Sequence, residues 1–159
     1  MFHYEQKNRK VLSYRFTKTQ FVKKTREESY KFFCDPYNLE EITPTSLSFK
    51  IKDVSKGGLK KGAVINYKLK LHGFPMQWQT IITEWADNHS FTDYQNSGPY
   101  TLWNHRHDFT EIKGGTLMED EVLMRPPLKQ LGWIVFPFVL KDVTNIFSFR
   151  REKIDNLIS

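Results

Sequence analysis

The sequence predicts an α+β protein in which a curved antiparallel sheet of seven strands packs around one long C-terminal helix. Six consecutive stretches between residues 47 and 125 alternate apolar and polar residues, and the turns between them are too short to hold crossover helices. Apolar residues at helical spacing follow from Phe138 to Ile158. Strands joined by hairpin-length turns pair antiparallel, and an amphipathic helix must bury its apolar face against such a sheet.

The elements before these six strands have clear start signals. A first strand is expected over residues 14–24, where apolar and polar residues alternate around one possible bulge. Thr25 and Glu28 have the spacing of a capping box, which predicts that a short helix begins there. Pro36 opens a second short helix, which ends before Pro44.

Two hairpins determine which side chains of the later strands share a face. The six strands are expected over residues 47–52, 63–72, 76–82, 89–96, 100–112 and 116–125. A turn at Asp87-Asn88 pairs Thr80 with Gln95, and Ile82 with Asp93. For the last hairpin, a turn at Gly114-Gly115 pairs Phe109 with Asp120, whereas a turn at Lys113-Gly114 pairs His107 with Asp120.

The chain is expected to form a single domain over residues 1–159. Its 159 residues, 39% of them hydrophobic, suffice for one core, and no repeat or flexible linker divides it. Residues 1–13 are expected to be a disordered or loosely attached N-terminal segment.

Composition excludes several classes of protein. The single cysteine, Cys34, excludes a disulfide scaffold and a cysteine-based zinc site. The net charge is +6, but the basic residues are scattered, so no nucleic-acid partner is expected. The longest apolar run, residues 131–140, is broken by Pro137 and is shorter than the ~20 residues of a membrane span. At most peripheral membrane contact is expected, and the absence of an apolar leader predicts a cytoplasmic location.

The strand over residues 100–112 carries the most informative pattern. Its period of two places the rings of Trp103 and Phe109 on one face, which we therefore assign to the concave interior. Six polar residues are then expected to point inward: Thr80, Asp93, Gln95, His105, His107 and Asp120. Their apolar surroundings are expected to be Tyr67, Trp78, Phe91, Trp103 and Phe109. Polar groups in a core are costly unless they bond to one another, to water or to a ligand.

Three interpretations of this polar cluster remain open. The cluster is a structural network in which Asp93 and Asp120 orient the histidines, or it fixes the polar head of a ligand in a cavity of about 300 Å³ or more. In the third interpretation His105, His107 and Asp120 act as an acid–base group or a facial metal triad. No third metal ligand has a diagnostic spacing, so no metal and no cofactor are expected.

The order of elements resembles the helix-grip fold of the START-like superfamily, over essentially the whole chain after residue 13. That superfamily includes lipid-transfer START domains, polyketide cyclase/dehydrase proteins and birch-pollen allergen-like proteins. Several motifs look like a bacterial branch labelled SRPBCC or cyclase/dehydrase-like: Ile42-Thr43-Pro44, Trp78-x-Thr80-x-Ile82, Phe91-x-Asp93-x-Gln95 and Gly98-Pro99-Tyr100-x-x-Trp103-x-His105-x-His107-x-Phe109.

The resemblance implies a binding protein, although the fold hosts carriers, sensors and a few enzymes. We expect noncovalent binding, carriage or sensing of a small hydrophobic or amphipathic molecule in a cavity between the sheet and the C-terminal helix. The expected ligand-contacting residues are Tyr67, Trp78, Thr80, Phe91, Asp93, Gln95, Trp103, His105, His107, Phe109, Asp120, Val143 and Phe147. The alternatives are a cyclase- or dehydratase-like enzyme that uses His105, His107 and Asp120, and a ubiquinone-type lipid chaperone. The sequence indicates neither the ligand nor the oligomeric state.

Overall fold

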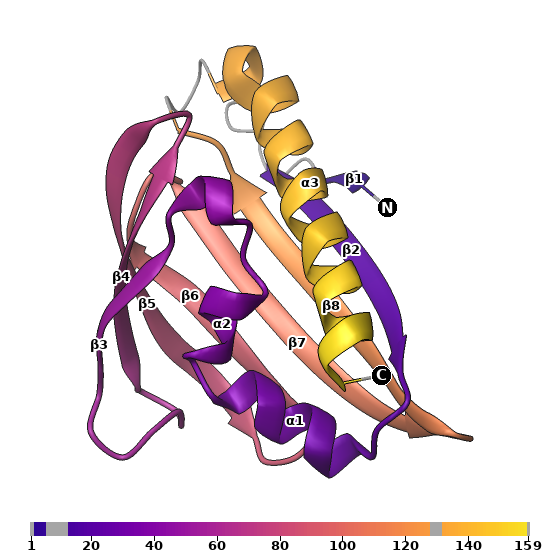
Figure 1. Ribbon diagram of the computed structural model, residues 1–159. Coiled ribbons are helices and arrows are strands. Elements are labelled where there is room, and N and C mark those ends of the chain that lie inside the picture. Colours follow the sequence, from indigo (N-terminus) through magenta and orange to yellow (C-terminus); the bar gives the residue numbers. More distant parts are fainter. Residues whose placement is uncertain (1, 6–12, 128–131, 159) are drawn as a thin grey trace.

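One antiparallel sheet and the helices on its concave face make up the fold (Figure 1). The computed structural model describes residues 2–5, 13–127 and 132–158. Its strands are β1 (Phe2–Glu5), β2 (Ser13–Val22), β3 (Lys50–Val54), β4 (Val64–Leu71), β5 (Phe74–Ala86), β6 (Ser90–Ser97), β7 (Leu102–Ile112) and β8 (Gly115–Arg125). The helices are α1 (Arg26–Cys34), α2 (Asn38–Glu41) and α3 (Gly132–Ile158), with a 3-10 helix, η1 (Thr45–Leu47).

The predicted fold class is confirmed, with one strand more than expected. The strands lie in the order β1-β2-β8-β7-β6-β5-β4-β3, and the seven predicted strands are β2 to β8. The additional strand, β1, lies within residues 1–13 and pairs with β2 at one edge of the sheet. A strand of four residues is too short to show alternation in the sequence.

Several element boundaries differ from the prediction, among them the starts of β3 and α3 and the end of β5 at Ala86. Residues 45–47 form η1 instead of the start of a strand, and Ser48 then takes a left-handed backbone conformation with φ 45°. An extended strand therefore begins only at Lys50. Helix α3 begins at Gly132 rather than near Phe138, and Pro137 lies inside it.

The start of α1 is as predicted. The backbone N–H of Glu28 donates to Thr25 Oγ1 at 3.2 Å, and the backbone N–H of Thr25 donates to Glu28 Oε2 at 3.1 Å. This reciprocal capping box satisfies two backbone donors that the first helical turn leaves without partners.

The hairpin registers place the predicted pairs opposite one another. In β5 and β6, Thr80 pairs with Gln95 and Ile82 with Asp93. The turn itself is one residue longer than expected, because Ala86 pairs with Ser90, and a bulge between Ile82 and Glu84 restores the expected register. In β7 and β8, His107 pairs with Asp120, as a Lys113-Gly114 turn requires.

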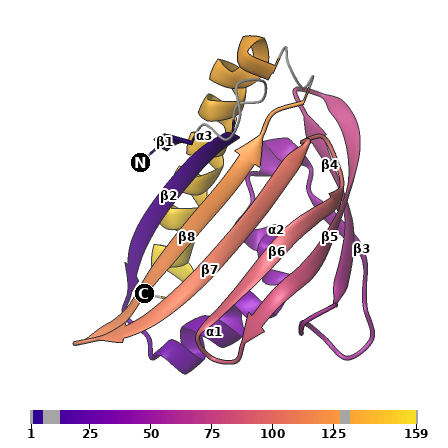
Figure 2. The ribbon, with the colours of Figure 1, turned by 180° about the vertical axis from the view of Figure 1, so that it is seen from behind.

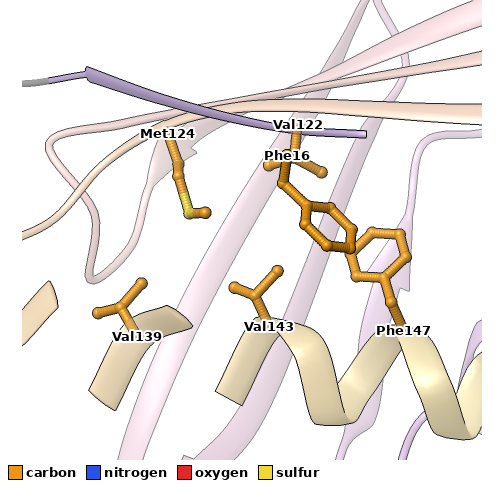
Figure 3. Close-up of a cluster of buried hydrophobic side chains, with 6 residues drawn as sticks. All are labelled: Phe16, Val122, Met124, Val139, Val143 and Phe147. Atoms are coloured by element: carbon orange, nitrogen blue, oxygen red, sulfur yellow. The ribbon is translucent and has the colours of Figure 1, made fainter. Parts of the chain in front are cut away.

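Helix α3 covers only part of the concave face of the sheet. Val139, Val143 and Phe147, four residues apart along α3, pack against Phe16 of β2 and residues of β8 (Figure 3). The rings of Phe16 and Phe147 are 4.7 Å apart between centroids. A second cluster, around Tyr30 of α1, packs against the other end of the sheet. The concave face between these clusters is left to line a cavity.

The opposite face of the sheet carries none of the described helices (Figure 2). No helix among the described residues is both long and apolar enough to cross a membrane.

Candidate functional site

A cavity of about 170 Å³ lies between the concave face of the sheet, α3 and the segment from α1 to η1. The volume is smaller than the expected value of about 300 Å³ or more, so that expectation is wrong. Large rings occupy part of the concave space and pack against one another, as their centroid separations show.

One wall of the cavity is aromatic. The Tyr67 and Trp78 rings stack with centroids 5.8 Å apart, and Trp103 meets Trp78 edge-on at 5.5 Å. Tyr100 packs against Trp103 with a centroid separation of 4.8 Å. The Tyr67 hydroxyl lies 3.2 Å from Thr80 Oγ1, whereas the buried Trp78 Nε1 has no hydrogen-bond partner. This wall suits a flat apolar body.

Beside the aromatic wall, on the same concave face of the sheet, two histidines are bridged by two aspartates; the four residues are Asp93, His105, His107 and Asp120. We call these four residues the Asp–His ring. The pairing of β6, β7 and β8 brings them together, since Asp93 is opposite His105 and His107 is opposite Asp120. Both histidines and Asp120 are 5% exposed, so their polar atoms depend mainly on one another for hydrogen bonds.

Each aspartate of the Asp–His ring contacts both imidazoles. Asp120 Oδ1 lies 2.9 Å from His105 Nε2 and 2.9 Å from His107 Nδ1. Asp93 Oδ2 lies 3.0 Å from His107 Nε2 and 3.6 Å from His105 Nδ1. The contact between Asp120 and His107 Nδ1 lacks the alignment of a hydrogen bond, so that buried nitrogen has no hydrogen-bond partner.

The pKa values of the two histidines in the Asp–His ring shift in opposite directions. Burial opposes a charge on His107, but Asp120 and Asp93 outweigh it and raise the pKa of His107 to about 9. Burial and the neighbouring His107 lower the pKa of His105. Burial alone would raise the pKa of each aspartate, yet the two histidines hold both pKa values below the ordinary range. Near neutral pH the metal-free ring therefore holds one imidazolium and one neutral imidazole between two carboxylates.

Arg150 of α3 brings a further charge to the cavity, where it is one of the lining residues. Its guanidinium lies over the Phe147 ring, 5.1 Å from the centroid, and its buried Nε has no hydrogen-bond partner. Burial lowers the pKa of Arg150, while the charges of Asp120 and Asp93 oppose this shift. Arg150 is not among the site residues expected from the sequence, although it falls on the apolar stripe of α3 together with Val143 and Phe147.

Solved structures share this fold over nearly the whole chain. A START superfamily protein from Mycobacterium smegmatis matches with a TM-score of 0.66 and 14% sequence identity, over 90% of this chain and 98% of that one. Ginseng major latex-like protein 151 from Panax ginseng matches with a TM-score of 0.68 and 14% identity, over 92% and 98%. The di-domain ARO/CYC protein BexL from the BE-7585A biosynthetic pathway matches with a TM-score of 0.69 and 16% identity, over 90% of this chain and 50% of that one.

The chain has the helix-grip fold of the START-like proteins. The resemblance predicted from the sequence is thereby confirmed at the level of the fold. By sequence, the chain matches no family model and no curated protein.

Within the helix-grip cavity, ten of the thirteen expected residues form part of the lining. They are Tyr67, Trp78, Thr80, Phe91, Asp93, Trp103, His105, His107, Val143 and Phe147. The other three, Gln95, Phe109 and Asp120, share the inward face of the sheet but lie outside the lining. Gln95 donates to the Tyr100 carbonyl at 2.7 Å and accepts from the Tyr100 N–H at 3.2 Å, so it holds the turn after β6. Phe109 belongs to the cluster around Tyr30, and Asp120 lies behind the histidines.

Proposed function

We propose that this helix-grip protein binds a small hydrophobic or amphipathic molecule noncovalently in the cavity between the sheet and α3. The observation that carries the proposal is the contrast between the two cavity walls, one of stacked rings and one of buried charged groups. Ligand sites combine such apolar surfaces with a few polar groups that fix orientation. The START-like resemblance supports the same class of function.

The unsatisfied donors of the cavity indicate what the ligand carries. Trp78 Nε1 and Arg150 Nε are buried, belong to residues that line the cavity, and lack hydrogen-bond partners. Since Arg150 is a cation and lines the cavity, we infer that the ligand directs acceptor oxygens toward this side chain. A compact aromatic or polyketide-like body with a carbonyl, carboxylate or phenolate head meets both requirements, and the cavity volume of about 170 Å³ favours a small one.

The test uses two tryptophan substitutions on neighbouring positions of β4. Leu69 lines the cavity and Lys70 is exposed, so Leu69→Trp fills the cavity while Lys70→Trp leaves it open. Chain purified from its own host is analysed by native mass spectrometry and organic extraction, and the amphipathic dye 8-anilinonaphthalene-1-sulfonate serves as a binding probe. We expect Leu69→Trp to lose both co-purified molecule and dye, and Lys70→Trp to keep them. Equal binding by both variants, or none by the unchanged chain, would overturn the proposal.

A cyclase- or dehydratase-like activity is the second candidate, because the Asp93–His107 pair faces the same cavity. A carboxylate-paired imidazole can act as a general acid or base toward a bound molecule. The test is to incubate the bound molecule with the unchanged chain and with a His107→Gln variant. A change in its mass with the unchanged chain, and none with the variant, would favour this candidate. The ubiquinone-type lipid chaperone, the cytoplasmic location and peripheral membrane contact stay predictions.

A further inference from the structure

The cavity face of the Asp–His ring presents three donor atoms of the kind that bind divalent metals. Asp93, His105 and His107 each offer one donor, and the three donors lie within 4.8 Å of one another. Asp93 Oδ2 is 3.0 Å from His107 Nε2 and 3.6 Å from His105 Nδ1. Two ligands that are each ~2.1 Å from a metal, at angles between octahedral and tetrahedral, are separated by ~3.0–3.4 Å. The first separation fits that spacing and the second is slightly longer, while the three donors together span up to 4.8 Å, so a metal has to draw the two imidazoles closer together.

Asp120 lies on the side of the two imidazoles that is opposite Asp93, where a carboxylate can orient metal-bound histidines. The imidazole nitrogens that face away from Asp93, His105 Nε2 and His107 Nδ1, both lie 2.9 Å from Asp120 Oδ1. Metal-bound histidines commonly donate their second ring N–H to a carboxylate, which fixes the tautomer and the ring orientation. Asp120 thus holds His105 by a hydrogen bond, whereas its contact with His107 Nδ1 has to gain hydrogen-bond alignment when a metal binds.

The charges around this point favour a cation. A metal has to displace the proton of His107, and the carboxylates of Asp93 and Asp120 then outweigh the guanidinium of Arg150, which leaves a formal charge of minus one for the metal to neutralise. All three donor residues line the cavity, whereas Asp120 does not. A metal held by two histidines and one carboxylate keeps open coordination positions, and here these positions face the ligand space.

We propose that Asp93, His105 and His107 bind a first-row divalent metal ion, with Asp120 as the positioning residue. The metal site does not depend on the proposed function. Only one extension rests on it, namely that the oxygen head of the ligand coordinates the open positions of the metal. No metal is expected from the sequence, and in the metal interpretation of the sequence Asp120 is the third donor. The strand register instead brings Asp93 of β6 to the cavity side of both histidines.

The test is a metal titration of the untagged full-length chain after treatment with a chelator. Co²⁺ is followed by its visible absorption and Zn²⁺ by calorimetry, and elemental analysis of freshly purified chain is done first. We expect one equivalent to bind, and binding to be lost in Asp93→Asn and His107→Gln. Asp120→Asn should weaken the affinity by about 10–100-fold, as loss of an outer carboxylate does. His89→Gln and His72→Gln are the matched controls, since both histidines are exposed and outside the three donors, and they should bind like the unchanged chain.

Absence of binding by the unchanged chain at millimolar metal would overturn the proposal, and so would unchanged binding by Asp93→Asn. Thermal melts verify that each variant is folded, and the nearly isosteric Asp93→Asn decides the question if the histidine variant does not fold. Dye binding by the metal-free chain is measured in the same series. Retained dye binding without metal binding would reject the metal site alone, and loss of both would reject the proposed function as well.

Discussion

At the scale of single residues, Asp120 is the group on which the polar wall depends. Its Oδ1 faces both imidazoles at 2.9 Å, and it is 5% exposed. Removing one partner from a buried charged cluster leaves the other partner desolvated and unpaired, which costs more than the pair itself contributes.

The pair His105–Asp120 therefore predicts a strong coupling in the metal-free chain. Asp120→Leu alone should lower the free energy of unfolding by roughly 3–5 kcal/mol, because it leaves the buried histidines without this carboxylate. The double variant with His105→Leu should lose less than the sum of the two single variants, with a coupling above about 0.5 kcal/mol. Urea denaturation of the two singles and the double measures this coupling, and strictly additive losses would contradict the hydrogen bond.

A second prediction at this scale concerns Cys34. Burial raises the pKa of the Cys34 thiol to about 11, with Tyr30 beside it at the end of α1. Only the thiolate is nucleophilic, so alkylation by iodoacetamide should remain slow at pH 8 and accelerate as the pH approaches 11. At pH 8 the folded chain should react at least about tenfold more slowly than the urea-unfolded chain, whose thiol has a pKa of about 8.5. Equal rates in the two states would show that Cys34 is not held in this environment.

At the scale of elements, the hairpins show what the sequence could predict. Apolar and polar alternation gave the inward face of β7 correctly, because a period of two depends on no long-range contact. The pairing of Thr80 with Gln95 was also correct, although the assumed turn was one residue too short. The bulge between Ile82 and Glu84 compensates for the longer turn, and nothing in the local sequence announces it.

The alternation of apolar and polar residues indicates which face of the sheet a residue lies on, but not which contacts it makes there. Gln95 was placed on the correct face, yet its amide reaches the Tyr100 backbone and lies outside the cavity lining. Arg150 is part of the cavity because α3 crosses the sheet above Asp93 and Asp120, a crossing that helical periodicity alone does not fix. The cavity volume likewise depends on how the rings of Trp78 and Trp103 pack, so it could not be predicted from composition.

The capping box of α1 provides an element-scale prediction. Thr25→Ala removes the acceptor for the Glu28 N–H and should lower the free energy of unfolding by about 0.5–2 kcal/mol. Thr25→Ser keeps the hydroxyl and should lose much less. Denaturant melts of both variants compare them directly, and equal losses would mean that the methyl group rather than the cap matters.

At the scale of the whole molecule, the tip of the β4–β5 hairpin and the N-terminal part of α3 lie at the same end of the fold (Figure 1). The tip of the β4–β5 hairpin contacts α3 there, since His72 Nε2 lies 2.9 Å from Asp142 Oδ2, and Asp142 also lines the cavity. Phe74 follows His72 in the hairpin, and Phe138 precedes Asp142 by one helical turn. Both phenylalanines are largely exposed, 70% and 64% respectively.

These exposed rings predict weak, peripheral membrane contact. Two rings at one end of a chain with scattered basic residues supply little apolar area compared with an interfacial anchor. In vesicle flotation at physiological salt, most of the protein should stay in the non-floating fraction when the vesicles contain only neutral lipids. A modest part should float when anionic lipid is added, because the chain has a net charge of +6. Phe74→Ala with Phe138→Ala should abolish that part. Tyr37→Ala, which removes a ring that is 61% exposed elsewhere on the surface, is the matched control and should leave flotation unchanged. Quantitative flotation on neutral vesicles would contradict the prediction and favour the lipid-chaperone alternative.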